Sequence, residues 1–373
     1  MRLTSASFVA LAGAVLFGAG WACLHREATA ESPVNVTDAT ALVLATAHDD
    51  GATSTDVRRV VIRADGVRTT TLGTIAHPPG AVVRGDSRGA RIAVVADDAL
   101  AADRGEHDWG SLLYQIGTAG PHAVASGVGH AGRPLVSEDG LVYVERGTRG
   151  PVPTDEAARE GHLREDAISI TAVDDDGNLR NVYSANGYAL HLCGEDGAEL
   201  VVYRVRFGGA ALLAIDRANG KSRVITEVAP FARDFTVDRA RHALVFSNRD
   251  SVDEHRWILA RVDLESGSTT ELQAEVDSAP APFALERGGF AFSAAARGGL
   301  TFDGAAPVAP TGAGFGAVQA ESRGGAWLLV AHVGSGYDET IALHRATTRV
   351  IRLTTRDERI DAIGFDGEGS VVR

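Results

Sequence analysis

The sequence is poor in residues that would place it in several common classes of protein. It has two cysteines, Cys23 and Cys193, so a disulfide framework cannot hold the fold together. Positive charge is also scarce. The chain has 36 Lys and Arg against 49 Asp and Glu, a formal net charge of −13. That balance argues against a nucleic-acid backbone or an anionic membrane surface as partner.

Long apolar runs are missing as well. The stretch Phe8–Ala22 is too short for a comfortable membrane span. It follows Arg2 and precedes Ala28-Thr29-Ala30, which is the order of an export signal with its cleavage site. We therefore predict a signal peptide over residues 1–30 and one folded domain over residues 31–373.

Two alternatives to a cleaved signal stay open. One is a lipoprotein signal that ends before Cys23, which would then carry the lipid; the other is an uncleaved anchor. Contact with a membrane would come only through that lipid or anchor. In each case we expect the domain to be exported, whether periplasmic, secreted or attached to the cell envelope.

Helical periodicity is the fourth absence, and only Thr154–Leu163, inside a loop, comes near it. The chain has instead short apolar or alternating runs separated by turns rich in Asp, Gly and Asn. In the clearest unit, Asp234–Glu275, this pattern predicts strands joined by turns into one antiparallel sheet. Such a sheet has two apolar faces, so it needs copies of itself to pack against.

The strand–turn–strand pattern recurs along the chain with the period range of propeller blades. Its copies are Val60–Leu72, Leu112–Ala125, Ile168–Ser184, Leu212–Thr226, Ile258–Leu272, Gly299–Pro310 and Ile341–Thr354. A further hairpin precedes each of the later copies. The pattern predicts an all-β fold, a seven-bladed β-propeller. Six or eight blades remain compatible with it, because the copy at Gly299–Pro310 is degenerate.

The two ends of the chain predict how the ring closes. Ile360–Arg373 resembles the first hairpin of a blade with nothing after it, and Ala41–Leu72 has later strands without a clear innermost one. If N- and C-terminal strands share that blade, the ring has no open sheet edges. We therefore expect a closed, monomeric propeller.

One blade carries a more specific resemblance. Its residues are Phe246-Ser247-Asn248-Arg249-Asp250, Trp257-Ile258, Arg261-Val262-Asp263-Leu264 and Glu271-Leu272. This pattern resembles the WD40-like (PD40) repeat of TolB-type propellers. The resemblance implies an exported propeller of a family whose members mostly bind proteins in the cell envelope. It transfers no catalytic residue, since the repeat has none.

Long, charged loops are expected on one face of such a propeller, and function tends to occupy such loops. We predict that this face binds an envelope or extracellular protein or peptide, with aromatic side chains as anchors. The candidate partner-binding residues are His107, Asp108, Trp109, Arg249, Asp250, Tyr337 and Asp338. The alternative is that these loops are simply solvated and acidic.

A metal site is the second idea, because the innermost strands of a propeller can direct carboxylates and imidazoles onto one ion. The candidate ligands, at the expected starts of innermost strands, are His77, His130, Asp234, Asp277 and Asp361. No G-x-S-x-G elbow or sialidase-type turn is present. We therefore expect a non-enzymatic binding module without a cofactor. The alternative is a calcium-dependent, lactonase-like hydrolase with its site at the channel mouth.

Overall fold

The computed structural model describes residues 38–49, 51–63, 66–100, 108–130, 132–249, 256–276, 279–294, 299–303, 315–333, 338–366 and 371–372. Contacts separate Met1–Asn35 from Val36–Arg373, and the description below concerns the second unit. The predicted signal peptide and Cys23 lie outside the described residues.

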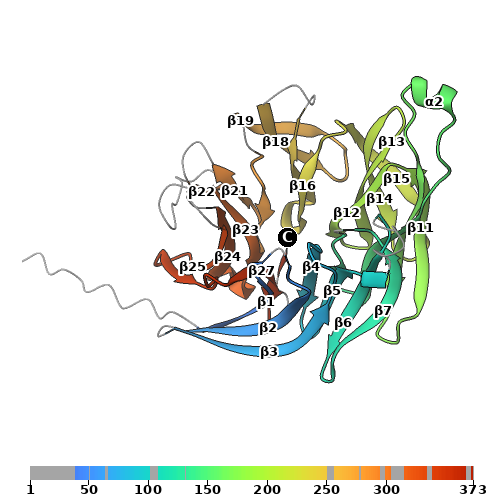
Figure 1. The fold of residues 1–373 in the computed structure, drawn as a ribbon. Coiled ribbons are helices and arrows are strands. Elements are labelled where there is room, and N and C mark those ends of the chain that lie inside the picture. Colours follow the sequence, from blue (N-terminus) through green and yellow to red (C-terminus); the bar gives the residue numbers. More distant parts are fainter. Residues whose placement is uncertain are drawn as a thin grey trace, which may run out of the picture. The chain divides into compact units, whose positions relative to one another are not determined.

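Antiparallel sheets make up the described part of the chain, and they follow one another in chain order (Figure 1). The first sheet contains β1 (Ala39–Ala47), β2 (Ser54–Arg63), β3 (Gly66–Ala76) and β27 (Glu358–Phe365). An eight-stranded sheet follows. Its first half contains β4 (Val83–Arg88), β5 (Arg91–Asp97), β6 (Ser111–Gly117) and β7 (Gly120–Val128). Its second half contains β8 (Leu135–Val136), β9 (Val142–Thr148), β10 (Asp166–Val173) and β11 (Leu179–Gly187).

Four further sheets complete the described chain. The next contains β12 (Ala189–Asp196), β13 (Glu199–Arg206), β14 (Gly209–Asp216) and β15 (Ser222–Val228). After it come β16 (Arg233–Asp238), β17 (Ala243–Asn248), β18 (Arg256–Asp263) and β19 (Thr269–Val276). A three-stranded sheet contains β20 (Phe283–Ala284), β21 (Phe290–Ala294) and β22 (Gly299–Phe302). The last contains β23 (Phe315–Glu321), β24 (Trp327–Val333), β25 (Asp338–His344), β26 (Arg349–Arg352) and β28 (Val371–Val372).

The sheet of β16 to β19 confirms the unit predicted over Asp234–Glu275, including its strand order. Its turns are stabilised by local polar groups, as the sequence indicates. Asp263 accepts a hydrogen bond from the Ser266 amide at 2.7 Å, and Gly267 adopts φ +72°, a conformation that L side chains rarely adopt.

The core is divided among clusters. Most of them join strands of neighbouring sheets, and one joins the two halves of the eight-stranded sheet. Tyr143 and Leu200, for example, pack together between β9 and β13, whereas Leu244 belongs to the cluster between β13 and β17. Another cluster joins the last sheet to the first, through Trp327 of β24 and Val43 of β1. Each sheet therefore buries both of its faces against its neighbours, which is why none could fold alone.

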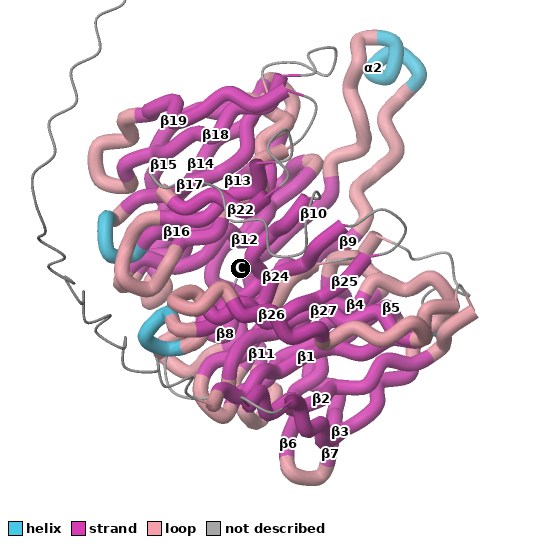
Figure 2. Tube along the Cα trace, turned by 90° about the vertical axis from the view of Figure 1, so that its left-hand side faces the viewer, coloured by secondary structure: helices cyan, strands magenta, loops and turns pink. Residues whose placement is uncertain are grey.

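The ends of the described chain meet in one sheet, as the sequence predicts, but by a different division of strands. β27 pairs antiparallel with β1, from Ala41 opposite Phe365 to Ala47 opposite Glu358. Figure 2 shows β27 beside β1. The expectation of a complete hairpin over Ile360–Arg373 was wrong, since β28 pairs with β23 instead. The buried run Ala41–Ala45 in β1 already fills the second position of this sheet.

The single α-helix longer than one turn in the described residues is α2 (Asp155–Arg159), on the loop between β9 and β10 (Figure 2). It begins where the sequence places its weak helical signal. The Thr154 hydroxyl caps it by accepting from the Ala157 amide at 3.3 Å. The all-β fold class is thus confirmed, and the helical segments of the described residues lie in loops and turns.

Candidate functional site

A cavity of about 460 Å³ lies where several innermost strands begin. Residues from β4, β16, β23 and β27 line it, together with the segment that leads into β20. They are Leu44, Val83, Arg84, Gly85, Arg133, Arg233, Asp234, Ala279, Ala281, Ala317, Gln319, Asp361 and Ala362. A volume of this size is typical of a site for a small ligand or a short peptide segment.

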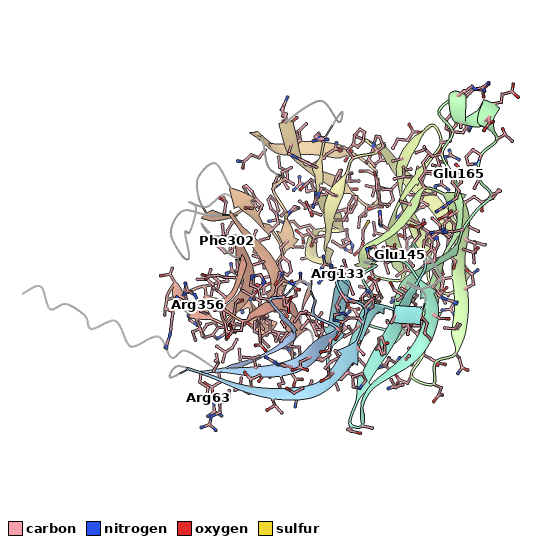
Figure 3. All side chains as sticks on the ribbon, in the orientation of Figure 1. Arg63, Arg133, Glu145, Glu165, Phe302 and Arg356 are labelled. Atoms are coloured by element: carbon pink, nitrogen blue, oxygen red, sulfur yellow. The ribbon has the colours of Figure 1, made fainter. Side chains whose placement is uncertain are left out.

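Basic side chains form one part of the lining. Arg84 is exposed and has no ion-pair partner among the described residues. Arg133, which Figure 3 labels near β4, also borders a smaller cavity of about 70 Å³. Arg233 is the third guanidinium. A cavity with three arginines offers charge-assisted hydrogen bonds to an anionic or strongly polar group.

Acidic side chains form the other part. Arg233 Nε lies 3.1 Å from Asp234 Oδ2, and Arg359 Nε lies 3.1 Å from Asp361 Oδ2. The Asp234 and Asp361 side chains are 18% and 25% exposed, so both carboxylates are paired but still reachable from the cavity. The site can therefore contact groups of either sign.

Two residues of the lining have a backbone conformation that is rare outside glycine. Asp234 has φ 55° and Ala281 has φ 47°, and both lie in the left-handed region. Such a conformation costs on the order of 1–3 kcal/mol and is concentrated at ligand-binding and active sites. Its occurrence in β16 and in the segment that leads into β20, both of which line one cavity, is independent support for a functional site here.

An aromatic support lies behind Arg233. The guanidinium carbon of Arg233 is 5.8 Å from the centre of the Trp257 ring, and that of Arg249 is 5.1 Å from it. Arg249 also lies 5.9 Å from the Phe231 ring. These cation–π contacts restrain both guanidiniums and give Arg249, a predicted partner-binding residue, a packing role beside the cavity.

The predicted metal ligands are only partly brought together. Asp234 and Asp361 line the same cavity, whereas Asp277 lies outside the described residues. His130 Nδ1 lies 3.0 Å from Asp97 Oδ1, away from this lining. In the described part of the chain, no group of three or more His, Cys, Asp or Glu side chains is placed to hold a metal ion.

His77 is buried at the end of β3, the outermost strand of its sheet. Its Nδ1 lies 2.9 Å from the Pro78 carbonyl oxygen, and its Nε2 lies 2.9 Å from Thr55 Oγ1. A carbonyl only accepts, so Nδ1 donates to Pro78, while Nε2 shares a hydrogen bond with the Thr55 hydroxyl. Both ring nitrogens are therefore used inside the protein.

Some of the other predicted partner-binding residues lie away from the 460 Å³ cavity, and the rest lie outside the described residues. Trp109 donates from Nε1 to Asp166 Oδ2 at 2.8 Å and borders a separate cavity. Asp108 pairs with Arg164 at 2.7 Å, and Asp338 is the first residue of β25. The remaining three lie outside the described residues: His107, Asp250 and Tyr337.

The sequence analysis missed the arginines of the cavity. Arg84 and Arg233 occupy the first two positions of innermost strands, the same positions that pointed to the aspartates. A search of the same positions for basic side chains, as well as for metal ligands, would have found Arg84 and Arg233. Arg133 lies just ahead of β8, a strand too short to show a pattern.

Comparisons with known proteins bear on the fold. No protein-family model matches the chain, and no curated protein matches it. Solved structures that it resembles include a puromycin-hydrolyzing peptidase of Mycobacterium tuberculosis, with a TM-score of 0.53 and 14% identity. The match covers 84% of this chain and 53% of that one. Another is a structure from a study of two prolyl endopeptidases, with a TM-score of 0.50, 12% identity, and coverage of 88% and 50%.

TolB from Acinetobacter baumannii is also similar, with a TM-score of 0.47, 13% identity, and coverage of 88% of this chain and 67% of TolB. TolB-type propellers are thus among the solved structures that the chain resembles, in line with the repeat pattern in its sequence. The chain spans about half the length of the two peptidase structures. In the described residues, no helix has the length and apolar character needed to cross a membrane.

Proposed function

We propose that this chain is an exported, non-enzymatic seven-bladed propeller that binds a protein or peptide at the start of its innermost strands. The cavity carries this proposal: it combines Arg84, which has no ion-pair partner in the described part of the chain, with the paired carboxylates of Asp234 and Asp361. An extended peptide presents amide groups and side chains of both charges, which is the mixture that this lining can contact.

The proposed ring of seven blades is supported by the pairing of β27 with β1 and by the core cluster between the last and first sheets. Dividing the eight-stranded sheet into β4–β7 and β8–β11 gives seven units of similar size. A closed ring holds the innermost strands in fixed positions, so a ligand meets a preformed site. Less conformational entropy is then lost when the ligand binds.

A selection from a random displayed peptide library tests this function. Peptides enriched on the immobilised protein are synthesised, and their Kd is measured by fluorescence anisotropy. Arg84→Ala should raise Kd about tenfold, equivalent to about 1.4 kcal/mol, because it removes a charged donor without breaking an internal pair.

Arg223→Ala is the matched control, since Arg223 is exposed and pairs with Glu199 in another part of the molecule. It should leave Kd unchanged. Failure to enrich any peptide, or an equal loss in the two variants, would contradict the proposal.

One observation favours a second candidate, a calcium-dependent hydrolase of the lactonase type: Asp234 and Asp361 line one cavity. The three arginines beside them oppose a divalent cation. Calorimetric titration with Ca²⁺ separates the two functions. Calcium binding that is lost in both Asp234→Asn and Asp361→Asn would support the hydrolase. If the parent protein gives no heat of binding, the peptide-binding function is the one that remains.

A further inference from the structure

The cavity beside Trp109, of about 410 Å³, lies where the two halves of the eight-stranded sheet meet. The ends of β5, β7 and β9 and the start of β6 surround it. Its polar and aromatic lining comes from Asp98, Trp109, Ser126, Thr148 and Arg149. β7 and β9 are bridged beside it, with Val128 opposite Arg146, so the walls belong to paired strands rather than to loops alone.

The Trp109 indole is held in one orientation. A Cβ added at Gly147 would lie 2.6 Å from the ring, so glycine there lets the indole pack against the backbone of β9. The indole Nε1 donates to Asp166 Oδ2 at 2.8 Å. A hydrogen bond from indole N–H to an ionised carboxylate draws electron density onto the ring, which strengthens the attraction of its π face for a cation.

The Asp166 carboxyl group is ionised at neutral pH. Burial opposes ionisation, but the Arg164 guanidinium, the Gly150 amide and the indole together lower the pKa of Asp166 below its ordinary value. Arg164 Nε lies 2.8 Å from Asp166 Oδ1, and the Gly150 amide donates to the same oxygen at 3.0 Å.

The charges around the cavity also favour a cation. The lining holds one carboxylate, Asp98, and one guanidinium, Arg149. Arg149 lies 3.3 Å from Asp108, so its charge is already balanced. Asp97 precedes Asp98 in the chain and accepts from the hydroxyl of the lining residue Ser111 at 2.7 Å, and its Oδ1 lies 3.0 Å from His130 Nδ1. Asp98 and Asp97 thus leave an excess of negative charge beside the indole face.

We propose that this cavity binds an organic cation: the guanidinium or ammonium group of a basic side chain presented by the partner. This inference rests on the proposed function, because the partner is the protein or peptide proposed there. It specifies that one contact is made by a basic side chain of that partner. The cation would lie over the Trp109 ring with Asp98 as its counter-ion. A net charge of −13 on the chain adds long-range attraction for a basic partner.

The test is titration of the full-length protein with tetramethylammonium and with agmatine. Binding is measured from the change in the NMR chemical shift of the Trp109 indole N–H. Both cations should bind, because each offers charge to the ring and the carboxylate. Asp98→Asn and Trp109→Leu should each weaken agmatine binding about tenfold, measured by calorimetry for the second variant, which lacks the indole signal.

Glu199→Gln is the control, because it removes one exposed carboxylate elsewhere and should leave both affinities unchanged. Methyl α-glucoside, a neutral ring that stacks on aromatic faces, is the competing probe. Saturable binding of the glucoside without the cations, equal binding by Asp98→Asn and the parent protein, or no binding at all would each overturn the inference. The selected peptides and Arg84→Ala test the other cavity, so failure of one proposal is visible without failure of the other.

Discussion

Glu195 of β12 accepts a hydrogen bond from Arg88 of β4 at 2.5 Å, although the two residues belong to different sheets. The Glu195 side chain is 2% exposed and also lies 2.9 Å from Arg217 and 2.9 Å from Arg239. Ser137 donates to the same carboxylate. One buried charge therefore joins three consecutive sheets at the end of the innermost strands opposite to the 460 Å³ cavity.

Replacing Glu195 with Gln should destabilise the protein by about 3 kcal/mol, because three guanidiniums would lose their shared partner in a place with little water. Urea denaturation would show this as a lower midpoint with an unchanged slope. Glu199→Gln is the matched control: it lies in the same hairpin, its side chain is 37% exposed, and its ion-pair partner among the described residues is Arg223. A midpoint shift of similar size in both variants would mean that the shared carboxylate is not important.

This cluster shows what the sequence could and could not predict. Strand alternation and turn residues are local, so they predicted the sheets and the sharing of one sheet by the two ends. Asp234 and Asp361 were found because position at a strand start is also local. Glu195, by contrast, is a polar residue in a turn-like stretch, and its partner Arg88 is 107 positions away. His77 was misplaced because β4 begins only at Val83, so His77 ends an outer strand instead of starting an inner one.

A pH dependence follows from Asp86, which is 6% exposed and accepts from the Val136 amide at 2.6 Å. Burial raises the pKa of Asp86 to about 6, against the attraction of Arg133. A carboxyl whose pKa is raised on folding favours the folded state below its unfolded pKa, near 4. That contribution is lost as the pH rises through 6, by about 3 kcal/mol in all.

Asp86→Asn removes this titration while its side-chain oxygen can still accept from Val136. The variant should be more stable than the parent by about 2 kcal/mol at pH 7 and differ little at pH 4. Urea midpoints measured across this range check the prediction, with the exposed Asp175→Asn as control. A difference between variant and parent that stays constant from pH 4 to pH 7 would rule out a titrating Asp86.

Two truncations distinguish the contributions of the last strands. Removing residues 358–373 deletes β27 and exposes the edge of β1, whose run Ala41–Ala45 is buried. We expect loss of the single cooperative unfolding transition and self-association by size-exclusion chromatography, since an apolar open edge recruits other strands.

Removing only residues 367–373 deletes β28, which pairs with two residues of β23. The protein should stay monomeric and lose no more than about 1 kcal/mol, in the range of surface changes. If the shorter deletion were as damaging as the longer one, the closure of the first sheet by β27 would not be the dominant contact of the C-terminal segment.

Trp257 links the stability of the sheet of β16–β19 to the shape of the 460 Å³ cavity, because its ring lies beside both Arg233 and Arg249. Trp257→Leu keeps an apolar side chain but removes the π face. It should cost about 1 kcal/mol in the free energy of unfolding and weaken binding of the selected peptides several-fold, as Arg233 is no longer held beside Asp234. Trp257→Phe, which keeps a ring, should retain most of both properties. Equal losses in the two variants would show that volume, rather than the cation–π contact, positions Arg233.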